Sequence, residues 1–359
     1  MAKGALDRAK SAKQDEFYTQ LEDIEKEMVH YRSYFEGKII YLNCDDPRWS
    51  NFWLYFTLNF DYFGIKKLIA THYVSGGSSY KYEYEHKNDT NDPVVVKTKL
   101  KGDGDFRSEE CIELLKEADV VASNPPFSLW REYIAQLIEY DKKFIILGNV
   151  NAIAYRDVFP LLKDDKIWFG PSISGGSREF RVPNTYTLRT SGHRVDDDGN
   201  RYVRVSGVRW YTNLDHNLKH EELVLTKFYE GNEEYYPHYD NYHAIEVSRT
   251  KNIPMDYDGI MGVPITFMDK YSPDQFEILG MAKTPICYDN NTEAKRTKIY
   301  ENVTKYNKDG STTTSSVLNS APVLEISEPL KNKTYYEVDG KMYRAVYSRI
   351  LIVNKKPKV

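Results

Sequence analysis

The sequence predicts an α/β protein whose central sheet is mainly parallel and is covered by helices on both faces. Short apolar segments alternate with helical segments from residue 38 to residue 163, which is the pattern of strands joined by helical crossovers. Later apolar segments are separated only by polar loops such as 196–200, so we expect the sheet to end in antiparallel strands. With 359 residues and 41% hydrophobic side chains, the chain can bury a core of this size.

The expected elements follow from apolar periodicity and from residues that begin or end helices. Apolar residues recur at helical spacing from Leu21 onward, which predicts a helix over 15–35. Ser50 is the expected N-cap of the next helix, and Gly64 marks its expected end. We expect strands at 38–42, 65–71, 94–96, 119–122 and 144–147, and further helices at 51–62, 108–116, 128–140 and 155–163.

The remaining segments are less regular. Residues 75–92 are polar, rich in Tyr and punctuated by Gly, Ser and Asn, so we interpret them as an excursion from the sheet. From about residue 229 the periodicity fades, and we expect a loop at the Ser/Thr-rich stretch 311–316. Later strands are expected at 166–170, 180–183, 203–210 and 223–228.

Charge is unevenly distributed along the chain. The 49 Lys and Arg against 53 Asp and Glu give a formal net charge of −4, which argues against a protein that coats DNA non-specifically. Residues 295–359 nevertheless carry 13 basic against 6 acidic side chains, and the first 13 residues are also basic. Basic ends suit a protein that clamps nucleic acid, although a solvated charged tail accounts for them as well.

The sequence also limits the compartment and the metal chemistry. No segment approaches the roughly 20 consecutive apolar residues that a membrane span requires, and the Lys-rich start lacks the apolar stretch of a secretory signal. We therefore expect a cytoplasmic protein. Cys44, Cys111 and Cys287 are too scattered for a disulfide framework or a zinc site, so we expect free thiols and no metal.

The most informative segment is 119–127, an apolar strand that runs into Asn124-Pro125-Pro126-Phe127 before a helix. In an open α/β sheet, ligands bind beyond the carboxyl ends of strands, where this turn is expected. The two prolines fix the backbone and remove two donors, which leaves a rigid loop rich in acceptors. The Asn124 side-chain oxygen and the Pro125 carbonyl can both accept hydrogen bonds from one amino group, while Phe127 can lie against an aromatic base.

An adenine N6 amine needs these acceptors, because its lone pair is delocalised into the ring until they draw the nitrogen toward tetrahedral geometry. A methyl donor such as S-adenosylmethionine then leaves mainly positioning to the protein. Two other interpretations remain open at this point. A Pro-Pro turn can simply end a strand, and the same tetrapeptide occurs in methyltransferases that act on glutamine in proteins or on bases in RNA.

Several segments, in order, resemble closely the EcoRI-type adenine-specific (N6-adenine) DNA methyltransferase family. They are 15–19, 43–47 with 50–52, 102–107, 123–127, 140–144, 210–214 and 261–267. The resemblance implies a Rossmann-like class I S-adenosylmethionine-dependent methyltransferase fold with a C-terminal target-recognition region. It implies a basic arm at 1–14, a catalytic and cofactor-binding domain at 15–228, and a DNA target-recognition region at 229–359.

The resemblance also implies which residues act. Asn124, Pro125, Pro126 and Phe127 would be catalytic, and three further groups would bind the cofactor: a motif that closes over it, a turn along its methionine part, and a pair at its adenine. In that order, these are Phe17, Tyr18 and Thr19; Asn43, Asp45, Asp46 and Pro47; and Asp105 and Phe106. Two features depart from the family pattern: Ser50-Asn51-Phe52 replaces the usual Gly-rich signature, and the strand at 65–71 does not end in an acidic residue.

We expect a bacterial or phage enzyme that methylates N6 of adenine in double-stranded DNA, in a restriction-modification or anti-restriction context, and that acts as a monomer. The target adenine would be flipped out and stacked on Phe127, with Phe180 a weaker candidate for its other face. GAATTC is the first recognition site to test. Two alternatives are a silent DNA-binding protein with this fold, which the intact Asn124 motif argues against, and an RNA or protein methyltransferase, which the long C-terminal third argues against.

Overall fold

The structure, a computed structural model, describes residues 17–87, 92–184, 186, 192–282 and 295–358. The basic arm at 1–14 and Cys287 lie outside the described residues. The chain divides into two compact units. The first comprises residues 1–152 and 167–216, and the second comprises 153–166 and 217–359. The boundary that we expect between the catalytic domain and the target-recognition region, at residues 228 and 229, stays a prediction.

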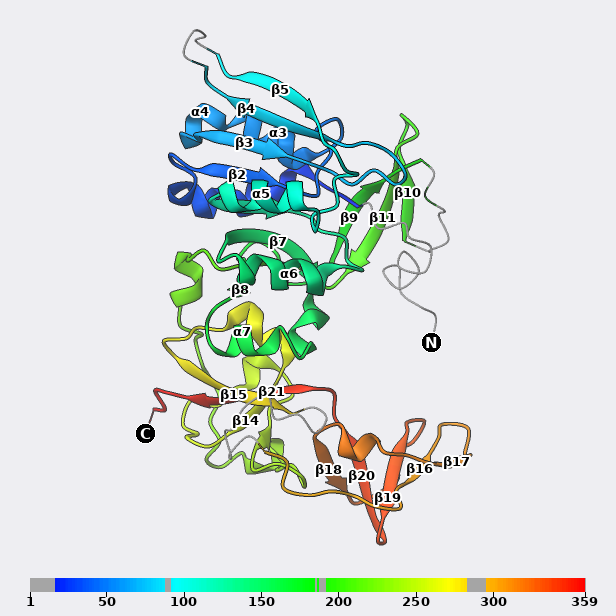
Figure 1. The fold of residues 1–359 in the computed structure, drawn as a ribbon. Coiled ribbons are helices and arrows are strands. Elements are labelled where there is room, and N and C mark those ends of the chain that lie inside the picture. The colour runs from blue at the N-terminus through cyan, green and yellow to red at the C-terminus, as the bar shows by residue number, and fades with distance from the viewer. Residues whose placement is uncertain (1–16, 88–91, 185, 187–191, 283–294, 359) are drawn as a thin grey trace. The chain divides into compact units, whose positions relative to one another are not determined.

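The first unit is built on an eight-stranded sheet in the order β5-β4-β3-β2-β6-β7-β12-β8 (Figure 1). Its four central strands are parallel, which confirms the predicted α/β class. β12 is antiparallel to both β7 and β8, so the sheet does end in antiparallel pairings. The bounds are β2 Ile39–Leu42, β3 Lys67–Ala70, β6 Val120–Ser123, β7 Lys143–Asn149, β8 Trp168–Phe169 and β12 Val208–Thr212.

Helices cover both faces of this sheet (Figure 1). Ile40 and Leu42 of β2 pack into one core cluster with α2 and α3, while α5 and α6 cover the other face. Ser50 is the N-cap of α3, and Gly64 ends α4 at a φ of 64°, as the sequence predicted. The helices are α2 Leu21–Met28, the 3₁₀ helix η1 Val29–Tyr34, α3 Asn51–Leu58, α4 Phe60–Phe63, α5 Glu109–Glu117 and α6 Trp130–Glu139.

Three expectations for this unit were wrong. The segment 75–92 contains β4 Tyr80–Glu85, which pairs with β3 and with β5 Val94–Lys99 and so extends the sheet. Its alternating Tyr and charged residues follow the period of a strand, with Tyr82 buried. The helix expected from residue 15 begins only at Leu21, after the short strand β1. The strand expected at 203–210 is two strands separated by Gly207, which has a φ of 75°.

A second, four-stranded sheet belongs to the same unit and has the order β1-β9-β11-β10. It is antiparallel throughout, and it joins the N-terminal segment to the region between β8 and β12. Its strands are β1 Tyr18–Thr19, β9 Ser177–Val182, β10 His193–Val195 and β11 Arg201–Ser206.

The second unit contains more regular structure than its sequence suggested. One sheet has the order β13-β14-β21-β15, and a five-stranded antiparallel sheet has the order β17-β16-β19-β20-β18. The loop expected at 311–316 contains a strand, and the strand expected at 223–228 is only an isolated bridge at Lys227. The elements are α7 Phe159–Lys163, β13 Ile245–Glu246, β14 Met261–Pro264, β15 Phe276–Ala282, β16 Thr304–Tyr306, β17 Thr312–Thr314, β18 Val323–Ile326, β19 Tyr335–Val338, β20 Lys341–Ala345 and β21 Arg349–Asn354.

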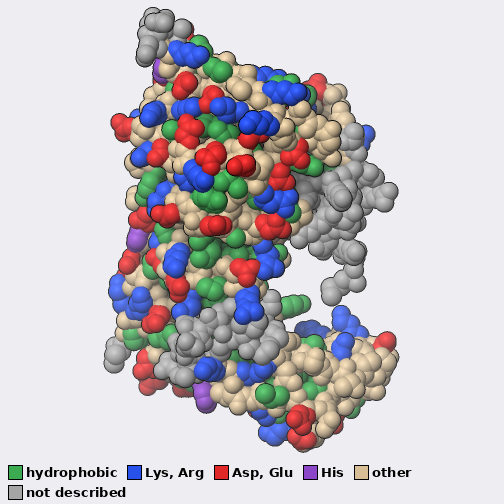
Figure 2. Space-filling model, viewed as in Figure 1, with side chains coloured by type: hydrophobic (Ala, Val, Ile, Leu, Met, Phe, Trp, Pro, Cys, Tyr) green, Lys and Arg blue, Asp and Glu red, His purple; other side chains and the backbone are tan. Residues whose placement is uncertain are grey.

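The remaining described elements are short 3₁₀ helices, and the charged side chains are mixed. On the face shown in Figure 2, acidic and basic side chains are interspersed rather than gathered by sign. No helix among the described residues is long and apolar enough to cross a membrane. The 3₁₀ helices are η2 Val150–Ala154, η3 Asn217–His220, η4 Glu233–Tyr235, η5 Thr250–Asn252, η6 Ile265–Lys270 and η7 Val317–Asn319.

Candidate active site

The candidate site lies where the parallel strands β2 and β6 end side by side. Residues 43–47 follow β2, and Asn124-Pro125-Pro126-Phe127 follows β6. From β2 the chain crosses to β3 on one side, while β6 and β7 lie on the other, so the connections diverge at this point. Ligands of open α/β sheets bind at such a divergence, beyond the carboxyl ends of the strands.

Asp45 joins the two strand ends. Its carboxylate accepts hydrogen bonds from the Ser50 hydroxyl at 2.7 Å and from the Ser123 hydroxyl at 2.8 Å. Burial raises the pKa of Asp45 to about 6, against the effect of these two hydrogen bonds. Ser50 also accepts from the backbone amides of Phe52 and Trp53, which begin α3. The serine thus caps a helix and holds Asp45 at the position where the sequence lacks a Gly-rich signature.

The Asn124 side chain is oriented by the N-terminal strand. Its Nδ2 donates to the Phe17 carbonyl, while its Oδ1 is buried and has no partner among the described residues. Two residues further on, the Thr19 carbonyl accepts from Asn51 Nδ2 at 2.7 Å. The segment around Tyr18 is therefore fixed by one amide from each strand-end loop. A carbonyl can only accept, so the Phe17 contact takes the donor Nδ2 of Asn124 and leaves its acceptor Oδ1 for another group.

Aromatic rings surround this contact. Phe17 lies edge-on to Phe127, Phe180 and Tyr186, with ring centroids 5.8, 5.9 and 6.0 Å apart. Phe127 is 8% exposed and Phe180 only 1% exposed. The structure thus brings together Phe17, Phe127 and Phe180, which the sequence assigned separately to the cofactor and to the target base. Pro125 is buried and Pro126 half-buried in the same loop.

Phe106, one of the two residues expected at the cofactor adenine, lies against Tyr133 of α6. Phe106 meets the Tyr133 ring edge-on at 5.1 Å, and the Tyr133 hydroxyl donates to the side-chain oxygen of Asn43. Asp105 accepts hydrogen bonds from Arg107, mainly through the guanidinium, and these hold the pKa of the Asp105 carboxyl below its usual range. Asp105 is therefore ionised at neutral pH.

Asp46 follows β2 in the chain, but its side chain lies beside His72, which follows β3. The strand β3 itself does not end in an acidic residue. The carboxylate of Asp46 is paired with Arg48 and is 3.5 Å from His72 Nε2. Burial alone would raise the pKa of Asp46, but the Arg48 hydrogen bonds outweigh it and leave the pKa low. Burial lowers the pKa of His72, whose Nδ1 is buried without a partner among the described residues. Pro47 is half-buried beside Asp46.

Sequence reasoning missed several residues of this arrangement. Ser50, Asn51 and Ser123 stood in segments that resembled the family, but nothing in their spacing showed what they contact. Tyr133 gave no functional signal, because it occupies an ordinary apolar position of α6. Cys44 and Cys111 are free thiols, and the described residues contain no cluster that could hold a metal ion.

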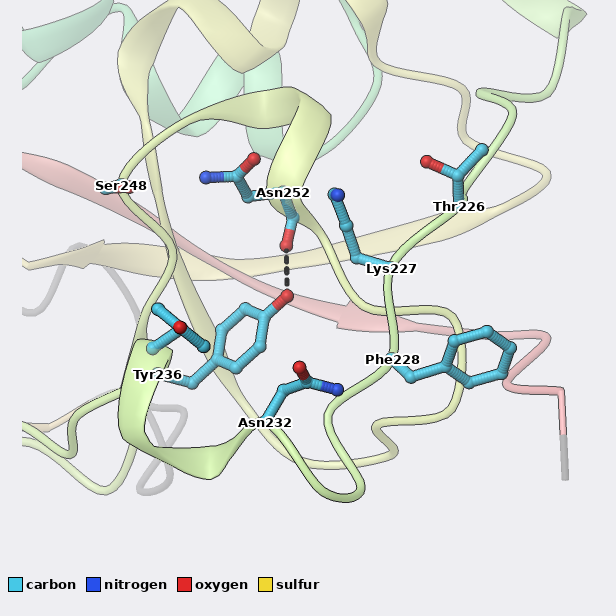
Figure 3. Close-up of a pocket in the computed structure, with 8 residues that line it drawn as sticks. Thr226, Lys227, Phe228, Asn232, Tyr236, Ser248 and Asn252 are labelled. Atoms are coloured by element: carbon cyan, nitrogen blue, oxygen red, sulfur yellow. Dashed lines mark hydrogen bonds between the residues drawn. The ribbon is translucent and has the colours of Figure 1, made fainter.

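A separate pocket of about 420 Å³ lies within the second unit (Figure 3). The Tyr236 hydroxyl donates to the Asn252 carbonyl across it at 2.9 Å. Phe228 and Tyr235, which also line the pocket, are 52% and 72% exposed, and Lys227 lies next to Phe228. Among the residues assigned from the sequence, none lines this pocket.

Comparisons with known proteins identify the family of this chain. The family described as "Adenine-specific methyltransferase EcoRI" matches residues 5–355. The chain is 50% identical to the type II methyltransferase M.EcoRI of Escherichia coli over 291 residues, covering 77% of this chain and 89% of that relative. It is 39% identical to M.MgeORF184P of Mycoplasma genitalium (78% and 87% covered) and 39% identical to M.MpnI of Mycoplasma pneumoniae (78% and 86% covered).

No solved structure matches the chain. The family match covers nearly all of the sequence, and the motif after β6 is intact. The chain therefore belongs to the EcoRI family of adenine-specific methyltransferases, enzymes that transfer a methyl group from S-adenosylmethionine to adenine in DNA.

Proposed function

We propose that the enzyme methylates the N6 amino group of adenine in double-stranded DNA, and that Asn124, Pro125, Pro126 and Phe127 form the catalytic loop. The observation that carries the proposal is the Asn124 amide, whose Nδ2 is held by the Phe17 carbonyl and whose buried Oδ1 has no donor among the described residues. A buried acceptor left without a donor is costly. An adenine N6 amine provides the missing donor.

The loop polarises the amine without removing its proton first. Asn124 Oδ1 and the Pro125 carbonyl accept the two N6 hydrogens, so that the nitrogen lone pair turns toward the incoming methyl group. S-adenosylmethionine, when bound, supplies that methyl group on a positively charged sulfur. The protein contributes preorganised acceptors and the in-line placement of the two reactants.

The residues at the strand ends fit this cofactor. Thr19 Oγ1 and His72 Nδ1 are buried polar atoms without partners among the described residues, and ionised Asp46 and Asp105 suit a ligand with ribose hydroxyls and positive charge. Asp45 differs, because both of its oxygens are bound to serines, so it positions the two loops. The proposed cofactor-binding residues are Phe17, Tyr18, Thr19, Asn43, Asp46, Pro47, Asp105 and Phe106, with Asp45 holding them in place.

We also propose that the target adenine leaves the duplex and lies against Phe127. An N6 amine inside stacked DNA cannot reach Asn124, and extrusion costs a few kcal/mol that aromatic stacking partly offsets. Because Phe17 meets both Phe127 and Phe180, the base has to be admitted by a shift of Phe17. Phe180, at 1% exposure, contacts the base only after such a shift.

Recognition of the DNA sequence is proposed for the C-terminal region, 229–359. Tyr235 of this region is 72% exposed at the pocket of the second unit, and Lys227 and Phe228, which just precede the region, line the same pocket, so this pocket is chemically suited to contact DNA. The chain is 50% identical to the type II methyltransferase M.EcoRI, and the resemblance of its motifs to the EcoRI-type family makes GAATTC the first site to test, in a bacterial or phage modification context. We also propose that the enzyme acts as a monomer in the cytoplasm.

The test compares Asn124→Ala with a matched control. Losing one preorganised polar contact of this kind lowers the rate by about 10²- to 10³-fold, while binding of S-adenosylmethionine should stay near wild type. Asn59→Ala is the control, since Asn59 also donates its amide to a backbone carbonyl, but at the opposite ends of the strands. Near-normal turnover of Asn124→Ala would remove Asn124 from the mechanism. Comparable methylation of tRNA would refute the DNA substrate.

A further inference from the structure

Tyrosine and arginine alternate in one row across the antiparallel sheet of the first unit. The strand register pairs Tyr18 with Arg181, Arg181 with Tyr202, and Tyr202 with Arg194. Directly opposed residues of neighbouring strands project from the same face, so these four side chains share one face. The other face carries Phe180 and the valines of β9 and β11, which are buried in the core. The row therefore lies on the outer face of the sheet that Figure 1 shows as β9, β10 and β11.

Arg181 differs from the other arginines of this face. Arg194 is paired with Glu179 at 2.6 Å, and Arg204 approaches the same carboxylate at 3.8 Å. Arg181 has no carboxylate partner in the part of the chain that the structure describes. Its guanidinium lies over the Trp49 ring, 5.6 Å from the ring centre. Stacking on an aromatic ring leaves the in-plane donors of arginine available for a ligand.

Trp49 is unusual as well, because its large ring is 54% exposed. Exposed tryptophans are enriched where proteins bind partners. Its side chain is not needed for the core of the first unit, since it is absent from the cluster of buried residues. The pair of Arg181 and Trp49 thus presents a cation and an aromatic surface together.

This pair lies beside the catalytic loop. Arg181 is opposite Tyr18, and the neighbours of Tyr18 are Phe17 and Thr19, which receive the amides of Asn124 and Asn51. Trp49 directly precedes Ser50, which is linked through Asp45 to the end of β6. Trp49 is thus one residue away from a contact that fixes the site, and Arg181 lies across from the residue between two such contacts.

We propose that Arg181 and Trp49 hold the DNA strand that carries the target adenine. The Arg181 guanidinium binds a backbone phosphate next to the target nucleotide, and the Trp49 ring packs against the neighbouring nucleotide. Arginine matches the geometry of phosphate oxygens with paired hydrogen bonds, and it keeps its charge at every working pH. This inference rests on the proposed function, because it takes Asn124 as the place where the target base is bound.

The first test measures DNA affinity at several salt concentrations. Arg181→Ala should raise the Kd for a duplex containing the methylation site by about 10- to 100-fold, as expected for a charge-assisted contact. It should also reduce the magnitude of the slope of log K against log salt by about one, the amount that a single phosphate contact contributes. Arg181→Lys keeps the charge and should fall between wild type and Arg181→Ala. Binding of S-adenosylmethionine alone should not change in either variant.

Arg32→Ala is the matched control. Arg32 also lies over an exposed ring, that of Tyr62 at 4.1 Å, but both residues precede strands and so lie at the amino ends of the sheet. This variant should keep wild-type DNA affinity within about two-fold, with an unchanged salt slope. An equal loss in Arg32→Ala and Arg181→Ala would show a general effect of charge and would overturn the assignment.

Trp49 gives an independent readout. Duplex DNA should quench tryptophan fluorescence in wild type. Trp49→Phe should lose part of that fluorescence change while keeping much of the DNA affinity. Trp49→Ala should lose that part of the fluorescence change and the DNA affinity as well. Wild-type affinity, salt slope and turnover in Arg181→Ala would refute the inference and leave the proposed function intact. Failure of the wild-type enzyme to methylate adenine in any duplex would instead refute the proposed function.

Discussion

Replacing Asp45 by Asn should change how stability depends on pH. Asp45 is 8% exposed and lies between two serine hydroxyls, and burial raises its pKa from 3.8 to about 6. In the unfolded chain the carboxyl titrates near its ordinary value. Between these two pKa values the folded protein binds more protons than the unfolded protein, so the free energy of unfolding falls as pH rises through this window.

The magnitude follows from the size of the shift. A pKa difference of about two units corresponds to about 3 kcal/mol at 1.36 kcal/mol per unit. Wild type should lose about this much stability between pH 4 and pH 7 through Asp45. Asn cannot ionise, but it keeps an acceptor for one serine and offers a donor to the other. The free energy of unfolding of Asp45→Asn should therefore compare least favourably with that of wild type at pH 4. Between pH 4 and pH 7 the difference should shift by about 3 kcal/mol in favour of the variant.

Hydrogen exchange of amides in β2 and β6 is the appropriate measurement, because the chain has two compact units and global unfolding need not be two-state. Asp105→Asn is a control of opposite sign. Its carboxyl has a lowered pKa, so its contribution is present above the unfolded pKa and is lost as pH falls. Parallel pH profiles for wild type and Asp45→Asn would show that burial does not raise the pKa of Asp45 in the folded protein.

Four further predictions concern the same unit. Asp105→Ala should weaken binding of S-adenosylmethionine more than binding of DNA, as calorimetry with each ligand can show, and equal losses would place the pocket elsewhere. Glu27→Gln should remove a fall in stability between pH 4.5 and 7, because burial raises the pKa of Glu27 to about 7, and denaturation at several pH values tests this. Gly170→Ala would make a methyl group overlap Glu27 Oε1 and should cost about 1–3 kcal/mol of unfolding free energy. Asn51→Ala frees the Thr19 carbonyl and should lower kcat more than it raises KM for S-adenosylmethionine, whereas an effect on KM alone would argue against positioning through β1.

The parallel centre of the sheet was predictable because its signals are local. Each of the four parallel strands β2, β3, β6 and β7 is a short apolar segment, and Ser50 and Gly64 mark helix ends by chemistry that acts within a few residues. The turn at Asn124 was recognisable for the same reason. Two prolines after an apolar strand restrict the backbone whatever surrounds them.

The rest depended on contacts between distant residues. Tyr80–Glu85 is a strand because β3 and β5 pair with it, and although its Tyr and charged residues alternate, the polar sequence around it gave no sign of those partners. The orientation of Asn124 depends on a carbonyl 107 residues earlier in the chain. The bridge from Asp45 to Ser123 spans 78 residues. Spacing along a sequence carries no information about such pairs.

The division of the chain into units has a consequence for engineering. Residues 153–166 leave the first unit and belong to the second, so the polypeptide passes between the units at 152, 166 and 216. Within the second unit, α7 from this segment packs against β15. A fragment that stops near residue 228 keeps α7 but loses its partner strand. Exchanging the whole second unit between relatives therefore requires transplanting two separate stretches of gene together, since a single junction would pack α7 of one parent against β15 of the other.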